Sequence, residues 1–392
     1  MNLASIALAA CGLAAGLTAQ TTWIVNAGGG PGVHFLDLPA AVAAATHGDT
    51  IRVQTGPFLQ GATPFITNKG LTILGDGGQV PMYGDFTNPY TIQGLAAGRA
   101  FRMAGFRRVG DGELNVHVHQ CAGEVHLENL RAFSHSAMFP SWPAIEIHHC
   151  ASVTLRGVET FGAPAVEIDH AAVVLVSCRL GLTTLGVGGG PCLRASNAHV
   201  DVVQPQFDPA WSSTAIQVWD SLLRVGGDAT ARVAGGQFTL TWQSIPIETF
   251  GNSIVLLDPA VQTPTFPAGQ PVMVGSGTLV VAPVPASWTA GVTSPGQLLT
   301  VHATAPPGAT LWQALGAPGP LTLVPFPIGL LGIDVYQPFA FFPANVVPAS
   351  GVVTNALAVP ASLPTGLAFA AQSVVLAGGV LELGMPVTLV LH

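Results

Sequence analysis

The chain has 392 residues, which is enough for more than one domain with its own hydrophobic core. Only 8% of the residues are charged, against about 25% in an average globular protein, whereas 49% are hydrophobic. The net charge of −8 and the lack of a basic run exclude a nucleic-acid-binding surface, and the hydrophobicity excludes a disordered chain. The 47 glycines and 32 prolines favour an all-β protein of many short strands joined by turns.

The first 19 residues have the composition of a secretory signal, because they are apolar and small and permit cleavage after Ala19. The tetrapeptide Leu8-Ala9-Ala10-Cys11 also matches a lipobox, so a lipid anchor at Cys11 is an alternative. No later segment is a continuous apolar span of about 20 residues, so no transmembrane helix is expected. We therefore expect a protein that is secreted or attached to the cell surface.

The first folded stretch carries a recognisable pair of motifs. Residues 35–45 have helix composition, with Pro39 near the start, and Gly48 fits the end. A strand follows in Gly48-Asp49-Thr50-Ile51-Arg52-Val53, and Lys69-Gly70-Leu71-Thr72-Ile73-Leu74-Gly75-Asp76-Gly77 opens another. At these residues the chain resembles the pectin-lyase-like family of right-handed parallel β-helices, in which a short helix caps the open end of the stack. The resemblance covers roughly residues 22–280 and implies the fold, not a reaction, because this fold hosts many activities.

Two stretches repeat each other 21 residues apart: residues 144–155 read AIEIHHCASVTL and residues 165–176 read AVEIDHAAVVLV. A unit this short cannot bury its own apolar face, so it must stack on copies of itself. Extended in both directions, the first strand of each repeat aligns at Val116, Ile145, Val166, Cys192, Ile216 and Ile247. In the second strands, the pairs expected to point inward are Val125-x-Leu127, Val153-x-Leu155, Val174-x-Val176, Val200-x-Val202, Leu223-x-Val225 and Ile254-x-Leu256.

We place the end of the β-helix near residue 283, because residues 259–297 are rich in Pro, Ala, Gly and Thr. The β-helix then spans residues 20–283, and residues 284–392 form a second module. Its predicted strands are 298–304, 310–315, 352–359, 369–376 and 380–391. They show no helical period, so a small antiparallel β-sandwich is expected.

Side chains alternate between the faces of a strand, so the polar positions of the first strands should form two outward columns. One column is His117, Glu146, Glu167, Leu193, Gln217 and Glu248; the other is His119, His148, Asp169, Ala195, Trp219 and Phe250. Neighbouring coils lie about 4.8 Å apart. Stacked carboxylates at Glu146 and Glu167, beside Asp169, could share a proton and supply a general acid. These three residues are the catalytic candidates, although ordinary solvent-facing pairs would look the same.

The other outward residues suggest binding rather than catalysis. Trp219 and Phe250 could offer ring faces to a sugar, with His119 and His148 along the same column. A metal site needs three or four ligands that converge on one point, whereas a column spreads its histidines along a line. We therefore expect no metal and no cofactor.

Four cysteines remain after cleavage of the signal, and Cys121 and Cys150 occupy equivalent corners of adjacent coils. Stacked positions are close enough for a disulfide. The sequence equally permits two reduced thiols in a buried ladder.

Three functions remain open. The first is a surface protein that contacts polysaccharide or another cell-envelope component and has no defined catalytic site. The second is a polysaccharide lyase or glycoside hydrolase acting on acidic polysaccharide through Glu146, Glu167 and Asp169. The known catalytic signatures of the fold family have no match here, and a purely structural surface protein is the third alternative.

Overall fold

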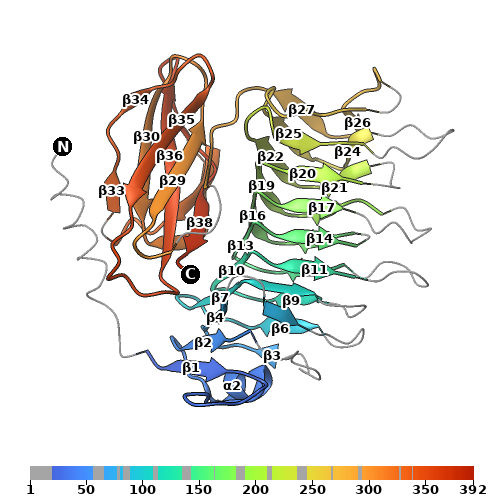
Figure 1. Ribbon diagram of the computed structural model, residues 1–392. Helices are drawn as coiled ribbons and strands as arrows, with labels where there is room; N and C mark the ends of the chain where they lie inside the picture. Colours follow the sequence, from blue (N-terminus) through green and yellow to red (C-terminus); the bar gives the residue numbers. More distant parts are fainter. Residues whose placement is uncertain are drawn as a thin grey trace.

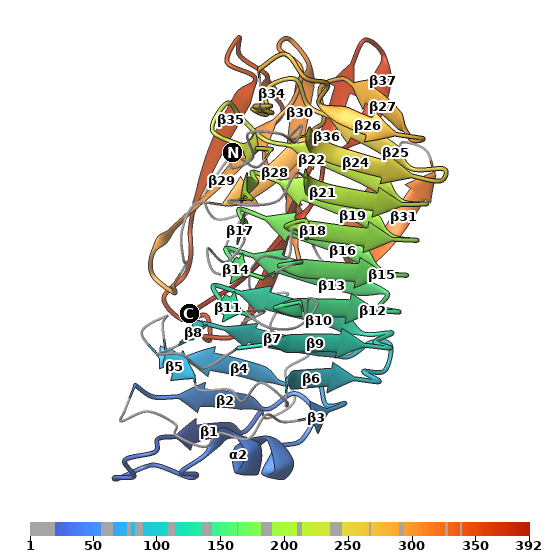
Figure 2. The same ribbon diagram turned by 90° about the vertical axis from the view of Figure 1, so that its right-hand side faces the viewer.

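In the computed structural model, the predicted repeats stack into a parallel β-helix of the right-handed type, built from three sheets (Figures 1 and 2). The structure describes residues 20–392 except for 56–65, 77–79, 83–88, 109–113, 135–142, 163, 182–189, 210–213, 236–244, 266–267, 290–293, 326–327 and 338. The expected signal over residues 1–19, with Cys11, lies outside the described residues.

Each coil from β4 to β24 gives one strand to each of the three sheets, and the coils at the two ends give fewer. Sheet A contains β1 (Thr22–Val25), β2 (Thr50–Val53), β4 (Thr72–Gly75), β7 (Ala100–Ala104), β10 (Glu124–Glu128), β13 (Ser152–Arg156), β16 (Ala172–Val176), β19 (His199–Val203), β22 (Leu222–Gly226), β25 (Ile254–Leu257) and β27 (Thr278–Val281). Sheet B contains β5 (Val80–Met82), β8 (Phe106–Arg108), β11 (Arg131–Phe133), β14 (Glu159–Phe161), β17 (Arg179–Gly181), β20 (Gln206–Asp208) and β23 (Arg232–Val233). Sheet C contains β3 (Ile66–Thr67), β6 (Tyr90–Gln93), β9 (Val116–His119), β12 (Ile145–His148), β15 (Val166–Asp169), β18 (Leu193–Ser196), β21 (Thr214–Trp219), β24 (Ile245–Phe250) and β26 (Met273–Gly275).

The one helix in the described ranges is α2 (Leu38–Ala44), which lies at the N-terminal end of the stack (Figure 1). The Asp37 carboxylate accepts the Ala40 N–H at 2.8 Å and caps the helix. Leu38, Ala41 and Val42 are buried in the same core as the strands. The helix is shorter than the predicted 35–45, mainly because Asp37 is the N-cap and the helix begins only at Leu38.

The interior of the stack is an apolar column that repeats from coil to coil. In sheet C its first members are Val116, Ile145, Val166, Leu193, Ile216 and Ile247, and all six are fully buried. Burial of each such side chain stabilises the folded state by about 1.5–3 kcal/mol relative to leaving it exposed to water. No single coil could keep these residues dry, so stacking is what stabilises each repeat.

The corner after each sheet C strand from β9 to β24 holds one residue in the left-handed backbone region. These residues, with φ between 45° and 62°, are Gln120, His149, His170, Asn197, Asp220 and Gly251. Their equivalent placement confirms the tight corner predicted between the first and second strands of each repeat. The repeated corner also keeps successive sheet C strands in register.

The predicted register is wrong at the fourth repeat. Val166 pairs with Leu193, so Leu193 and Ala195 point into the core, whereas Arg194 and Ser196 face outward. The strand starts at Leu193, one residue after the predicted first position, Cys192. A shift by one residue exchanges the two faces of a strand. Cys192 and Leu193 are adjacent and both apolar, so the sequence pattern fits either register.

Two inward pairs in sheet A are wrong for a different reason. In β16 the core contains Val173 and Leu175, not Val174 and Val176. In β25 it contains Val255 and Leu257, not Ile254 and Leu256. Val174 and Val176 are buried on the outer face, in a cluster with residues of the C-terminal module. Because both faces of sheet A are covered here, the strand shows no alternation of apolar and polar residues.

The C-terminal module lies along the outer face of sheet A (Figure 1). Its strands are β28 (Ala286–Thr289), β29 (Leu298–Thr304), β30 (Thr310–Gly316), β31 (Pro318–Pro325), β32 (Ile328–Ile333), β33 (Phe339–Phe341), β34 (Asn345–Val346), β35 (Val352–Ala358), β36 (Ala368–Ala377), β37 (Val380–Leu383) and β38 (Val387–Val390). Their pairings are antiparallel, as a sandwich requires. The strand predicted over 380–391 is two strands, because Pro386 lacks the N–H that a continuous ladder would need.

Candidate functional site

The outer face of sheet C carries the predicted site residues in two straight columns. Parallel pairing in register places each outward residue directly beside its counterpart in the next coil. One column is His117, Glu146, Glu167, Arg194, Gln217 and Glu248; the other is His119, His148, Asp169, Ser196, Trp219 and Phe250. Arg194 and Ser196 are the two members that the sequence analysis missed.

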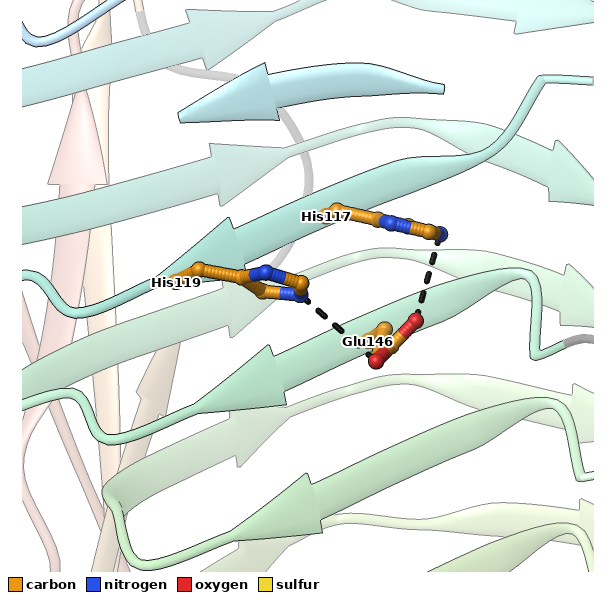
Figure 3. Close-up of side chains that lie close together, drawn as sticks. All are labelled: His117, His119 and Glu146. Atoms are coloured by element: carbon orange, nitrogen blue, oxygen red, sulfur yellow. Dashed lines mark ion pairs between the residues drawn. The ribbon is translucent and has the colours of Figure 1, made fainter. Parts of the chain in front are cut away.

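At the N-terminal end of these columns, three histidines surround one carboxylate, and Figure 3 shows two of them, His117 and His119, beside Glu146. His117 Nε2 lies 3.3 Å from Glu146 Oε2, and His119 Nε2 lies 3.6 Å from Glu146 Oε1. His148 Nε2 approaches Oε1 to 2.9 Å. The imidazoles come from adjacent strands β9 and β12, and their side chains lean together across the strand spacing. The expectation that a column spreads these donors along a line is therefore wrong for His117, His119 and Glu146.

The protonation of this cluster follows from burial and from the neighbouring charges. The His119 imidazole does most to lower the pKa of Glu146, whose partial burial acts in the opposite direction. Burial lowers the pKa of His117, and the Glu146 charge opposes this only in part. Glu146 is therefore a carboxylate at neutral pH, beside a largely neutral His117.

The other two catalytic candidates are also paired with partners of their own. Asp169 accepts a hydrogen bond from Ser196 Oγ at 2.6 Å and lies 2.8 Å from His170 Nδ1. Burial acts to raise the pKa of Asp169, but these two contacts outweigh it and the pKa is lowered. Glu167 has Arg194 Nη1 at 3.7 Å. The predicted sharing of a proton between Glu146 and Glu167 is not supported, because each has a different basic partner.

The C-terminal half of the face carries a stacked aromatic pair. The rings of Trp219 and Phe250 stack with centroids 4.6 Å apart and planes only 6° from parallel. The Arg194 guanidinium lies 5.9 Å from the Trp219 centroid. Gln217 Nε2 donates to Glu248 Oε2 at 2.7 Å in the adjacent column. Half-buried ring faces thus lie next to polar groups that can donate and accept hydrogen bonds.

The cysteines form a buried ladder and not a disulfide. Cys121 and Cys150 are free thiols, and they lie at equivalent corners, where the Ala151 N–H donates to the Cys121 carbonyl at 2.8 Å. Each thiol donates to carbonyls: Cys121 to His119 at 3.3 Å, and Cys150 to His148 at 3.2 Å. The sulfurs are therefore already satisfied as hydrogen-bond donors, which is the second of the two alternatives that the sequence allowed.

The protein also has a cavity of about 290 Å³, which lies away from sheet C. It is lined by Arg224 and Leu256 of sheet A, by Val284 of the connecting segment, and by Leu381 and Glu382 of β37. None of the predicted site residues contributes to it. The cavity belongs to the junction between the β-helix and the C-terminal module.

Comparisons with known proteins give the chain no family. No family model and no curated protein matches its sequence. One similar solved structure is the enzymatically active domain of tailspike protein 4 of bacteriophage CBA120, with 10% sequence identity and a TM-score of 0.28. The match covers 86% of this chain and 64% of that domain, so this chain spans just under two thirds of its length. Within the described residues, no helix is long and apolar enough to cross a membrane.

Proposed function

We propose that the protein is an exported surface protein that binds polysaccharide along the outer face of sheet C. Residues 1–19 would direct export, and the β-helix would end near residue 283. The observation that carries the proposal is the stacked, parallel pair of Trp219 and Phe250, which lies in register with the polar columns.

The chemistry of this surface suits a sugar chain better than a charged or a wholly apolar ligand. Aromatic ring faces pack against the apolar faces of sugar rings, while polar neighbours pair with hydroxyl groups. Gln217, Glu248 and Arg194 supply such neighbours beside the rings. His119 and His148 extend the polar surface along the same column. Because the columns continue from coil to coil, an extended polymer can contact side chains on several strands along its length.

The electrostatics favour binding over acid catalysis. A general acid must keep its proton near neutral pH, which requires a raised pKa. The neighbours of Glu146 and Asp169 lower their pKa values instead. Glycosidases also use two carboxyl groups about 5–9.5 Å apart on opposite sides of the bond that breaks. Glu146 and Glu167 instead lie side by side on one face of sheet C. The lyase or hydrolase alternative therefore has less support than binding.

A glycan array, followed by titration with the best ligand, tests this proposal. We expect Trp219→Ala and Phe250→Ala to weaken binding about tenfold or more, as truncation of a central aromatic contact does. Phe341→Ala is the matched control, because Phe341 is a 49% exposed aromatic residue of the C-terminal module. Equal affinity of all three variants and the unmodified protein would refute the site.

An assay for new reducing ends on the same ligand separates binding from catalysis. Release of fragments that is lost in Glu167→Gln would support the enzyme alternative. Failure to bind any glycan would support the purely structural alternative.

A further inference from the structure

The cluster at His117, His119 and Glu146 has donors of the kind that hold a transition metal. Two imidazole nitrogens and a carboxylate oxygen lie within 4.8 Å of one another. Figure 3 shows both imidazoles pointing toward the same carboxylate from the neighbouring strand. Imidazole with carboxylate suits Zn²⁺, whereas Ca²⁺ and Mg²⁺ prefer oxygen ligands alone.

The spacing of the donors agrees with a small tetrahedral ion. Zinc bonds to nitrogen and oxygen of about 2.0–2.1 Å place tetrahedral ligands about 3.3 Å apart. His117 Nε2 lies 3.3 Å from Glu146 Oε2 and His119 Nε2 lies 3.6 Å from Oε1, so the two nitrogens approach different oxygens of the one carboxylate, and one donor atom from each residue lies within 4.8 Å of the others. A zinc ion would therefore need little movement of the backbone, because the strands already hold the three residues in register.

A second observation separates this cluster from ordinary surface pairs. The His117 side chain is only 10% exposed, and its Nε2 atom is buried without a hydrogen bond. His119 Nε2 is buried in the same way. Buried polar atoms are nearly always satisfied, so nitrogens left without hydrogen bonds beside a carboxylate indicate a missing partner.

We infer that His117, His119 and Glu146 bind one Zn²⁺ on the outer face of sheet C, with the fourth position open to water or a ligand. His148, 2.9 Å from Glu146 Oε1, orients the carboxylate, as residues next to metal ligands commonly do. The inference does not rest on glycan binding, because the pair that carries that proposal, Trp219 and Phe250, lies on coils further along the stack, although His119 belongs to both surfaces.

The test is zinc binding by the full, untagged chain after treatment with a chelator. Isothermal titration with ZnCl₂ and metal analysis after dialysis should give one zinc per chain. The cobalt-substituted protein should show the visible absorption of tetrahedral Co²⁺. Zinc should also raise the melting temperature, because an ion that binds only the folded state stabilises it.

Substitution locates the site. We expect His117→Ala, His119→Ala and Glu146→Gln each to weaken zinc binding by roughly tenfold or more. His34→Gln is the control, because His34 is an exposed histidine at the N-terminal end of the stack. Circular dichroism of the metal-free variants checks that each one folds. The inference is overturned if the unmodified protein binds no zinc, or if bound zinc survives all three substitutions, as it would at the neighbouring cluster of His149, Asp169 and His170.

Discussion

Replacing Arg156 by methionine removes the cation from a charged pair buried between sheet A and the C-terminal module. Arg156 is 3% exposed and its partner Glu128 is 2% exposed, and the two are joined by a direct ion pair. Arg156 Nε also donates to Thr289 Oγ1 of β28 at 2.9 Å. The second Glu128 oxygen accepts the Val390 N–H of β38 at 2.9 Å. The pair thus links two coils of the β-helix to two strands of the module.

The expected cost of Arg156→Met is about 3–5 kcal/mol of unfolding free energy, because a buried carboxylate is left without its cation. Burial acts to raise the pKa of Glu128, and Arg156 is the main group that lowers it. Without Arg156, only His392 and the Val390 N–H still oppose the effect of burial, so the pKa of Glu128 should rise. A carboxyl group whose pKa is raised on folding costs stability above its unfolded pKa, so the variant should regain stability as the pH falls toward about 4.

Urea unfolding at neutral and at mildly acidic pH measures these effects. The matched control is the double variant Glu128→Gln/Arg156→Met, in which a neutral amide can still accept the Val390 N–H. We expect the double variant to lose only about 1–2 kcal/mol, the cost of a few hydrogen bonds. If it is as unstable as Arg156→Met, and neither depends on pH, the reasoning about a stranded charge is wrong.

Two further predictions concern the β-helix. The pKa of Asp201 is lowered to about 2 from 3.8, because Arg224 outweighs the opposing effect of burial; about 2 kcal/mol of stability should therefore be lost as the pH falls from about 4 to 2. Asp201→Asn should flatten this part of the pH–stability curve measured by urea unfolding, and an unchanged slope would contradict the assignment. Gly251 has a φ of 62°, and a Cβ there would collide with the Asp220 carboxylate, so Gly251→Ala should cost more than the roughly 1–2 kcal/mol of backbone strain alone. Gly94→Ala measures that strain alone, because Gly94 has a φ of 69° and open space around it; equal melting temperatures for the two variants would refute the steric argument.

The sequence was sufficient to predict the β-helix and most of its register. Where one face of a strand meets water, as in Ile145–His148, the alternation of apolar and polar residues correctly separates inward-facing from outward-facing side chains. It fails at Val174 and Val176, because the outer face of β16 packs against a module whose position the sequence does not show. It also fails at Leu193, where two adjacent apolar residues allow either register.

For the candidate residues, the sequence predicted the face on which most of them lie but not their contacts. Periodicity placed Glu146, His148 and Asp169 on one outward face, and the structure has them there. The approach of His117 and His119 to Glu146 depends on how side chains lean across two strands, which periodicity does not specify. The contact of Arg194 with Trp219 was missed because of the register error.

The most direct test of polysaccharide binding on sheet C is hydrogen exchange of the full chain with and without the glycan selected on the array. The account predicts slower exchange in and around β18, β21 and β24, the strands that carry Arg194, Trp219 and Phe250. Protection confined to the C-terminal module or to sheet B, with these three strands unchanged, would contradict it.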